Sequence, residues 1–376
     1  MVKIVVAIDS FKGSLTSMEA GNAAKEGILK AVSKADVIVR PLADGGEGTF
    51  EALTSGMGGA IQQIEVTGPL GGKVTASYGI IPESSTAVME MSQAAGITLI
   101  NESDRNPLNT TTYGVGEMIK DAIYKGCRKF IVGIGGSATN DGGIGMLQAL
   151  GFKILDRNGK QVSLGARGLA EVDSISTDEV LAELIECEFK IACDVTNPLF
   201  GPNGASAVFG PQKGATPEMV ADMDRWLYDF ASICNDSDPT APGTGAAGGL
   251  GFAFKTFTNS ILESGIRIVL DETNLEDYIK DADLVITGEG RLDSQTVYGK
   301  APIGVAAIAK QYNIPVIAFA GSVSDDACIV NNYGIDAFFP ITRSICSLQE
   351  AMQKETAKRN LTNTVEQVMR IYYRNI

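Results

Sequence analysis

The 376-residue sequence contains no histidine, and this absence excludes several kinds of catalytic site. Neither a Ser-His-Asp nor a Cys-His arrangement can form, and no imidazole is available to hold a transition metal. General-base chemistry must therefore depend on Asp, Glu, Lys, Tyr or a coordinated water molecule. A bound metal would have to be a hard cation held by oxygen ligands, and Mg²⁺ is the leading candidate.

Cysteine is scarce and scattered, with six residues and no Cys-x-x-Cys pair. This pattern indicates neither a zinc site nor a disulfide framework, so we expect most of the thiols to be small buried groups. Apolar runs are short: a run such as 314–320 falls well below the roughly 20 residues that span a bilayer. The segment 1–11 is typical of a strand and lacks a signal-peptide cleavage site, so we expect a cytoplasmic protein.

Positive charge is in deficit, and the formal net charge is −14. Such a balance argues against nucleic acid and against an anionic membrane as partners. A small anionic substrate would need a local group of Lys, Arg or backbone N–H donors to offset the general repulsion. The length and the globular composition, with 44% hydrophobic and 20% charged residues, predict two or three domains.

The 43 glycines gather where apolar runs end. The stretch 129–145 shows the pattern: an apolar run, then Gly135-Gly136 and a small polar segment, then a helical pattern over 144–150. Such a loop lets backbone N–H groups approach an anion closely, because glycine has no Cβ in the way. For one loop of this kind, an ordinary strand-to-helix turn is the alternative interpretation.

The order of elements at the N-terminus predicts a parallel sheet. The segment 2–8 is a near-continuous apolar run, as in strands that are buried on both faces. Thr16 and Glu19 form a capping box that begins a helix reaching about residue 31, and a second strand follows at 36–42. This order predicts an α/β fold with a parallel, doubly wound (Rossmann-like) sheet.

The pattern changes between about residues 61 and 92, where polar alternation and hairpin-like turns predict antiparallel strands. Strands of the parallel type return by residue 284. We therefore expect a discontinuous Rossmann-like domain and a second, inserted α/β domain with a mixed sheet, at residues 1–60 with 280–376 and at residues 61–279, respectively.

Two other segments have distinctive patterns. The segment 236–251 is rich in Gly, Ala and Pro, and it is either a flexible linker or a lid beside a nucleotide. Ser347-x-x-Glu350 is a capping box, and it predicts the start of a long C-terminal helix.

Acidic side chains recur where the predicted strands end. Any one of them could be a helix cap or a turn former, but repetition among glycines is harder to explain in that way. Parallel sheets bind ligands at the carboxyl ends of their strands, and acids with interspersed basic residues suit Mg²⁺ and phosphate. The acids, with the basic residues near them, are Asp9 with Lys12, Asp44 with Glu47, Asp141, Asp194, and Glu289 and Asp293 with Arg291 and Lys300.

Known nucleotide-binding motifs match poorly. A Walker A motif with its Gly-Lys pair at Gly299-Lys300 would need Gly at 294 and Ser or Thr at 301, where the sequence has Ser and Ala. Gly133-x-Gly135-x-x-Ala138 does match the dinucleotide fingerprint, so an NAD-dependent oxidoreductase is one alternative. A non-catalytic, ligand-binding regulator is a second alternative.

Six blocks of the sequence resemble the bacterial glycerate kinase family, in the order in which that family has them: DSFKGS (9–14), ADGGEGT (43–49), GIGGSATNDGG (133–143), CDVTNPL (193–199), FGPQKGA (209–215) and TGEGRLDSQTVYGKAPIGVA (287–306). The resemblance spans nearly the whole chain. It implies ATP-dependent phosphorylation of D-glycerate with Mg²⁺, and 2-phosphoglycerate is the expected product, with the 3-position left open. It also implies two α/β domains.

On this resemblance we expect a carboxylate to take the proton of the substrate hydroxyl. Asp194, at the tip of a predicted buried strand, is the candidate. Asp194 could equally bond the backbone of the turn 195–197. Lys12 is the second catalytic candidate, since a cation offsets charge on the transferred phosphoryl group. A solvated surface lysine is the alternative for Lys12.

The ligand-binding residues are assigned in the same way. The planar fork of Arg291 suits a carboxylate, so glycerate is assigned to Arg291, Asp293, Asp9 and Ser10. ATP is assigned to Gly135, Gly136, Ser137, Thr139 and Lys300, although this glycine loop could hold the substrate carboxylate instead. Mg²⁺ is assigned to Asp44, Glu47 and Glu289, without deciding which of them contact the metal. Whether the protein is a monomer or a dimer stays open.

Overall fold

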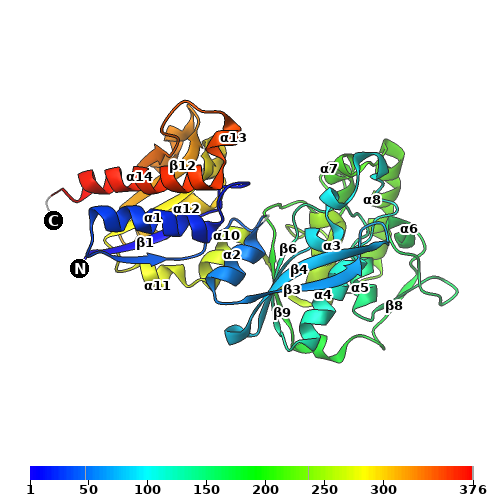
Figure 1. Ribbon diagram of the computed structural model, residues 1–376. Helices are drawn as coiled ribbons and strands as arrows, with labels where there is room; N and C mark the ends of the chain where they lie inside the picture. Colours follow the sequence, from blue (N-terminus) through cyan, green and yellow to red (C-terminus); the bar gives the residue numbers. More distant parts are fainter. Residues whose placement is uncertain (47, 236, 375–376) are drawn as a thin grey trace. The chain divides into compact units, whose positions relative to one another are not determined.

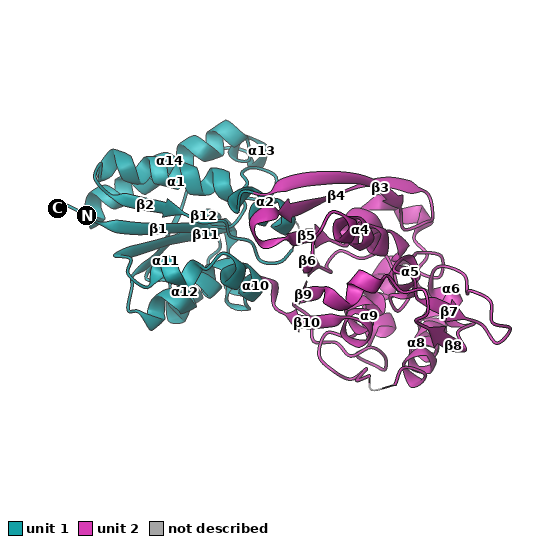
Figure 2. Cartoon of the chain, turned by 90° about the horizontal axis from the view of Figure 1, so that it is seen from below, with its two compact units in different colours: residues 1–58, 266–376 teal, residues 59–265 magenta. Residues whose placement is uncertain are grey.

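The structure, a computed structural model, describes residues 1–46, 48–235 and 237–374. The chain divides into two compact units. Unit 1 comprises residues 1–58 and 266–376, and unit 2 comprises residues 59–265 (Figure 2). Each unit has its own sheet, and the chain leaves unit 1 once and returns to it once.

The segment 266–279 belongs to unit 1, whereas the sequence pattern placed it in the inserted domain. It forms most of α10 (Gly265–Glu272) and all of α11 (Leu275–Ile279). Arg40 binds this segment: Nη2 donates to Thr273 O at 2.6 Å, and the guanidinium lies 4.5 Å from the centre of the Tyr278 ring. Arg40 and Thr273 are 233 positions apart, so no local pattern in the sequence reveals the contact.

Unit 1 is built on a five-stranded sheet whose strands are all parallel, in the order β13-β12-β11-β1-β2. In Figure 2, α1 and α14 cover one face of this sheet, and α11 and α12 cover the other. The doubly wound sheet predicted from the sequence is thereby confirmed. The strands are β1 (Lys3–Ile8), β2 (Asp36–Val39), β11 (Leu284–Leu292), β12 (Val316–Val323) and β13 (Ala337–Pro340).

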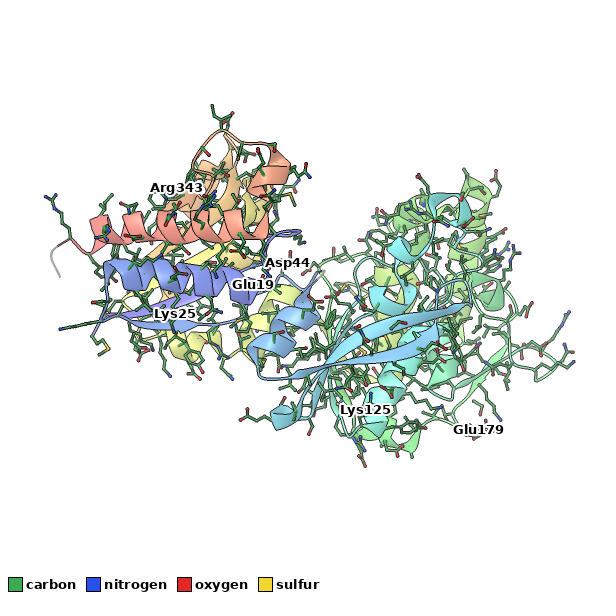
Figure 3. The ribbon with its side chains drawn as sticks, viewed as in Figure 1. Glu19, Lys25, Asp44, Lys125, Glu179 and Arg343 are labelled. Atoms are coloured by element: carbon green, nitrogen blue, oxygen red, sulfur yellow. The ribbon has the colours of Figure 1, made fainter. Side chains whose placement is uncertain are left out.

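The helices of unit 1 bury the apolar strand residues that the sequence pattern identified. Ile4, Val6 and Ile8 of β1 are fully buried in one core with residues of α1 and α14. The predicted capping box is present at the start of α1, where Thr16 Oγ1 and the Glu19 carboxylate each accept a backbone N–H (Glu19 is labelled in Figure 3). The helices are α1 (Ser17–Ala31), α2 (Thr49–Gly56), α12 (Ala301–Gln311), α13 (Leu348–Ala351) and α14 (Lys354–Tyr372).

The C-terminal helix is interrupted, in contrast to the sequence-based prediction of one long helix. Ser347 and Glu350 form the expected capping box, but the helix they begin, α13, ends at Ala351. Gln353 has φ −59° and ψ 127°, which is not helical, and α14 starts after it. The interruption leaves α13 as a short separate element beside the strand ends of unit 1.

Unit 2 has a six-stranded mixed sheet in the order β10-β9-β6-β5-β4-β3. Its strands β3 and β4 lie side by side in Figure 1. β5, β6, β9 and β10 are parallel, whereas β3 and β4 add an antiparallel hairpin at one edge. The hairpin lies in the segment where the sequence predicted antiparallel strands. The strands are β3 (Ala60–Thr67), β4 (Lys73–Ile81), β5 (Thr86–Glu90), β6 (Lys129–Gly133), β9 (Glu188–Ala192) and β10 (Asn259–Glu263), and β7 (Lys153–Leu155) and β8 (Ser174–Ser176) form a separate hairpin.

The core of unit 2 is rich in aromatic side chains. Phe130 of β6 stacks on Phe189 of β9 with ring centres 4.6 Å apart, and Phe254 packs against Phe189.

Among the described residues, no helix has the length and apolar character needed to cross a bilayer. The helices of unit 2 are α3 (Ser92–Ala95), α4 (Tyr113–Tyr124), α5 (Ile144–Ala149), α6 (Ala166–Leu169), α7 (Ala205–Phe209), α8 (Pro217–Ser232) and α9 (Leu250–Phe257).

The close approach of α1 and α14 generates a stability prediction. A Cβ at Gly27 would lie 2.3 Å from Thr362 O, and Thr362 Oγ1 donates to Ala23 O at 3.0 Å across the same contact. Alanine normally favours a helix by about 1 kcal/mol over glycine. Here we expect Gly27→Ala to destabilise the protein by about 2 kcal/mol, because the two backbones must separate. Thermal unfolding measures the change, and Asn22→Ala, on the exposed side of α1, is the control. An unchanged or higher melting temperature for Gly27→Ala would contradict this packing.

Candidate active site

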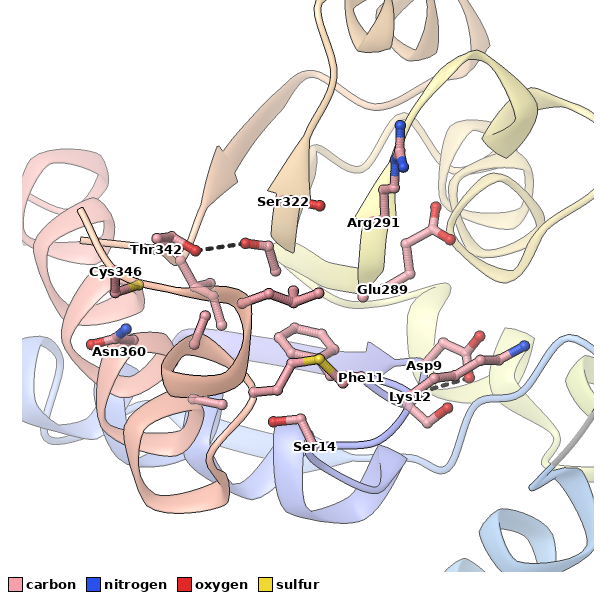
Figure 4. A pocket seen from close by; sticks show the side chains of 18 of the residues that line it. Asp9, Phe11, Lys12, Ser14, Glu289, Arg291, Ser322, Thr342, Cys346 and Asn360 are labelled. Carbon is pink, nitrogen blue, oxygen red and sulfur yellow. Dashed lines mark hydrogen bonds between the residues drawn. The ribbon is translucent and has the colours of Figure 1, made fainter. Parts of the chain in front are cut away.

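A cavity of about 600 Å³ lies at the carboxyl ends of the strands of unit 1 (Figure 4). The strand order explains its place. From β1 the chain continues to β2 on one side, and from β11 it continues to β12 on the other, so the connections diverge between β1 and β11. Open parallel sheets have their ligand crevice at this point, outside the carboxyl ends. Among the residues that line the cavity are seven assigned from the sequence: Asp9, Ser10, Lys12, Asp44, Glu289, Arg291 and Lys300.

Three carboxylates crowd the charged side of this cavity. Asp9 directly follows β1, is 7% exposed, and accepts a hydrogen bond from Ser10 N at 2.6 Å. Burial, together with repulsion from Asp44 and Glu289, raises the pKa of Asp9 to about 7, although the Ser10 N–H and Lys12 act in the opposite direction. Carboxylates in such an arrangement are stabilised by protonation or by a cation.

Glu289 and its neighbours form an ion-pair network on β11 and the loop that follows it. Thr296 Oγ1 donates to Glu289 Oε1 at 2.7 Å, and Lys300 Nζ lies 3.5 Å from Oε2. Burial raises the pKa of Glu289, and the Thr296 hydrogen bond and Lys300 oppose the rise. Asp293 lies 3.7 Å from Lys300 Nζ and 3.4 Å from Arg291 Nε, so it joins the basic residues to the network. The Arg291 side chain is 69% exposed, which leaves its guanidinium accessible to a ligand.

The carboxylates suit Mg²⁺ only if the ligand supplies part of the coordination. Within residues 1–46, 48–235 and 237–374, no group of three or more acidic or cysteine side chains could hold a metal on its own. Mg²⁺ commonly uses one or two carboxylates together with water and phosphate oxygens, and Asp44 and Glu289 fit that requirement. The third residue assigned to metal, Glu47, lies outside the described residues.

The glycine loop that contains Gly135 and Gly136 belongs to unit 2, where it follows β6. Gly135 and Gly136 are exposed, Gly136 has φ +71°, and a Cβ built on Gly135 would meet only open space. Ser137 and Thr139 are buried beneath them. The loop thus presents backbone at the carboxyl edge of the unit 2 sheet.

Lys213 is a buried lysine that sequence reasoning did not assign. Its Nζ donates to Ser137 Oγ at 2.8 Å and to Thr139 O at 2.6 Å, so it fastens the glycine loop from beneath. Lys213 is only 2% exposed, and burial lowers the pKa of its ammonium to about 7, although Asp141 acts in the opposite direction. The available signal was its position in the block FGPQKGA, but only the packing reveals its burial.

Asp141 has a structural role in the same loop. It is fully buried and its Oδ2 accepts from Thr112 N at 2.8 Å and from Thr112 Oγ1 at 2.9 Å, while Oδ1 accepts from Gly143 N at 3.1 Å. These bonds are those of a turn former. The segment predicted as a linker or lid, 236–251, is described from residue 237 onward, and it supports the loop because Gly142 N donates to Gly248 O at 2.9 Å. Residues 243–251 of this segment are buried.

Asp194 is an exposed residue two positions after the end of β9, at the carboxyl edge shared with the glycine loop. Its Oδ1 accepts a hydrogen bond from Gly265 N at 3.1 Å, at the start of α10. The register pairs Gly133 with Ala192, so the loops that carry Ser137 and Asp194 leave adjacent strands. Asp194 and the glycine loop therefore belong to one edge of the unit 2 sheet.

The dinucleotide fingerprint does not have its usual structure. In that motif the last small residue lies at the start of the helix, whereas α5 begins at Ile144, well after Ala138. Asp156, at the expected ribose-binding distance, accepts backbone N–H groups from Asn158 and Lys160 in a hairpin turn. The geometry thus gives no support to the oxidoreductase alternative.

The buried ammonium of Lys213 generates a prediction on the pH dependence of stability. Free lysine titrates near 10.4, so between pH 10 and 7 the unfolded chain binds a proton that the folded chain does not. Stability should therefore rise with pH across this window in the parent protein by up to about 1.4 kcal/mol per pH unit relative to Lys213→Met. Urea unfolding followed by Trp226, the single tryptophan and a residue of α8, measures this. Lys160→Met, at an exposed position, is the control, and parallel pH curves for the parent and Lys213→Met would contradict the prediction.

Comparison with known proteins gives one consistent result. A family model described as the glycerate kinase family matches residues 4–373. A glycerate kinase from Haemophilus influenzae is 47% identical over 374 residues, which cover 98% of this chain and 98% of the relative. A glycerate 2-kinase from Escherichia coli K12 is 46% identical over 378 residues, covering 98% and 99% of the two chains.

A solved structure agrees with the sequence relatives. A crystal structure described as a glycerate kinase 2 from Salmonella typhimurium LT2 aligns with a TM-score of 0.91 and 46% sequence identity, over 99% of this chain and 98% of that one. The aligned region includes both units and the blocks of sequence that carry the charged residues described above. The chain therefore belongs to the glycerate kinase family.

Proposed function

We propose that the protein transfers the γ-phosphoryl group of ATP to the 2-hydroxyl group of D-glycerate, giving 2-phosphoglycerate. The observation that carries this proposal is the cavity of unit 1, where Lys12, Arg291 and Lys300 accompany three carboxylates at the strand ends. Family membership supports the same activity, and one relative is a glycerate 2-kinase. Phosphoryl transfer needs little covalent chemistry from the protein, since positioning and charge stabilisation supply most of the rate enhancement.

The basic side chains would offset the charge that spreads over the phosphoryl oxygens in the transition state. Lys12 is exposed and lies in the loop after β1, close enough to Asp9 to lower its pKa. Lys300 is held by Glu289 and Asp293, so its ammonium is fixed before a ligand binds. Such preorganisation avoids the cost of ordering a flexible lysine during the reaction.

Asp44 and Glu289 would hold Mg²⁺, and the ion would supply charge neutralisation of the phosphate oxygens. The raised pKa of Asp9 supports this assignment, because carboxylates that repel one another in a buried place gain from a cation between them. A bound Mg²⁺ would thus relieve the repulsion between the carboxylates of the cavity.

Asp194 is the proposed base for the substrate hydroxyl. Its carboxylate is exposed to a ligand and it follows a strand end, where a phosphoryl acceptor would be held. The bond from Gly265 N engages Oδ1 and orients the carboxylate. A histidine cannot take this role in a sequence that has none.

Release of ADP on mixing the protein with ATP, D-glycerate and MgCl₂, followed by a coupled assay, tests the activity. We expect release that depends on D-glycerate, and phosphorus NMR of the product should show the 2-phosphate. No release above the ATP-only blank, with glycerate binding retained, would favour the ligand-binding regulator. Enhanced NADH fluorescence on mixing would instead favour the oxidoreductase.

A conservative variant tests the base. Asp194→Asn keeps an oxygen acceptor for the Gly265 N–H but loses the ability to take a proton, so we expect kcat to fall by about two decades with an unchanged melting temperature. Asp173→Asn, an exposed acid in unit 2, is the control and should retain full turnover. A near-normal kcat for Asp194→Asn would remove it from this role.

A further inference from the structure

We propose that the cavity of unit 1 is the nucleotide site, with the adenine base at its apolar end and the triphosphate at its charged end. Glycerate is then held by the glycine loop of unit 2. This assignment exchanges the two ligands relative to the sequence-based expectation, which gave Arg291 to glycerate and the loop to ATP. It rests on the proposed function, because it divides the two substrates of that reaction between two sets of residues.

The two ends of the cavity differ in chemistry. Figure 4 shows Asp9, Lys12, Glu289 and Arg291 on one side, with Cys346 and Asn360 on the other and the Phe11 ring between them. Apolar side chains of the lining come from the loop after β1, the segment after β13, and α13 with the residue after it: Phe11, Ile341, Leu348, Ala351 and Met352.

An apolar end requires a ligand with apolar surface. D-glycerate is a three-carbon acid with a polar group on every carbon, so it would leave this wall exposed to water. A purine base is flat and largely apolar on its faces, and aromatic and thioether side chains such as Phe11 and Met352 pack well on such a ring. A volume of about 600 Å³ lies within the range of sites for ligands larger than a small acid.

The charged end suits a chain of phosphates. Lys12, Arg291 and Lys300 line it together, and Lys300 immediately precedes α12. The Lys300 side chain makes no cap hydrogen bond to the first turn of that helix. A helix N-terminus attracts phosphate through its backbone N–H groups and its dipole. Three cations and a helix terminus exceed what a single carboxylate needs.

The glycine loop of unit 2 has the features of a site for a small acid. Lys213 places a buried amino group beneath the loop, and an anion bound there would favour its protonated, positively charged form. Because Ser137 Oγ accepts from Lys213, its own O–H group is left to donate. Gly135 and Gly136 add open backbone, and Asp194 leaves the adjacent strand. An acceptor bound here would be held at the same sheet edge as its proposed base.

Cys346 provides a direct reporter of the apolar end. It is exposed and lines the cavity, whereas Cys328 is also exposed, belongs to the same unit and does not line it. Alkylation by iodoacetamide, quantified at each cysteine by mass spectrometry of the whole chain, therefore compares site and control in one sample. The probes are ATP, adenosine, inorganic tripolyphosphate and D-glycerate, each added alone at saturating concentration.

We expect ATP and adenosine to slow alkylation of Cys346 at least fivefold and to leave Cys328 unchanged. Tripolyphosphate and D-glycerate should leave both rates unchanged. The nucleotide assignment would be overturned if ATP did not slow alkylation of Cys346, or if D-glycerate slowed it as much as ATP does. Protection by tripolyphosphate without protection by adenosine would overturn the placement of the base. The alkylation rates do not depend on catalysis, so a failure of this proposal can be distinguished from a failure of the glycerate phosphorylation assay.

A pair of variants gives a second test. Met352→Ser removes apolar surface from the cavity, and we expect the KM for ATP to rise about fivefold with the KM for D-glycerate unchanged. Ile345→Ser, at a fully exposed position outside the cavity, is the matched control and should change neither constant. A rise confined to the KM for D-glycerate would contradict the proposal even if the enzyme remained an active kinase.

Discussion

The structure depends on one constraint: parallel strands bring all of their carboxyl ends to the same edge, and charges placed there must share a confined, partly buried space. In unit 1 this edge gathers Asp9, Asp44 and Glu289 with three basic side chains. Burial makes each charge costly unless it has a partner, so Glu289 is bound by Thr296 and Lys300. The same constraint that makes the edge unstable without partners makes it suited to a charged ligand.

Unit 2 also has polar and charged groups at the carboxyl ends of its parallel strands, but it pairs them with different residues. Its parallel strands end beside a glycine loop, and the compensating charge is a lysine brought from a distant helical segment rather than from the loop itself. Lys213 donates to a hydroxyl and a carbonyl, and burial lowers the pKa of its ammonium. Its two hydrogen bonds hold the Lys213 amino group in place, and an anion that reached the loop would favour the protonated form. Each unit thus has a sheet edge that could bind an anion, and a reaction between two anionic substrates requires two such sites.

The proposed division of the two substrates between the edges rests on shape rather than on charge. Both edges carry basic groups and backbone donors, so charge alone does not separate a triphosphate from a carboxylate. The interruption between α13 and α14 is decisive here, because it places Leu348, Ala351 and Met352 against the strand ends as an apolar wall. The hydrophobic contact available to a purine, and not to a three-carbon acid, is what distinguishes the two ligands.

Local pattern determined much of this protein in advance. The run 2–8, the Thr16–Glu19 capping box and the alternation after residue 61 gave the parallel sheet and the mixed sheet correctly, since period and capping are properties of neighbouring residues. The acids at strand ends were visible for the same reason, and so was the resemblance to the glycerate kinase family.

Tertiary structure alone decided how these parts are used. Arg40, which follows β2, binds Thr273 between α10 and α11, although the two residues are 233 positions apart. Lys213 is buried beneath Ser137, which lies 76 positions away in the sequence. The apolar end of the cavity depends on α13 returning to strands that lie far from it in the chain. Burial, pKa and cavity shape are properties of residues brought together by packing. The order of residues in the sequence does not give the distances between those residues in space.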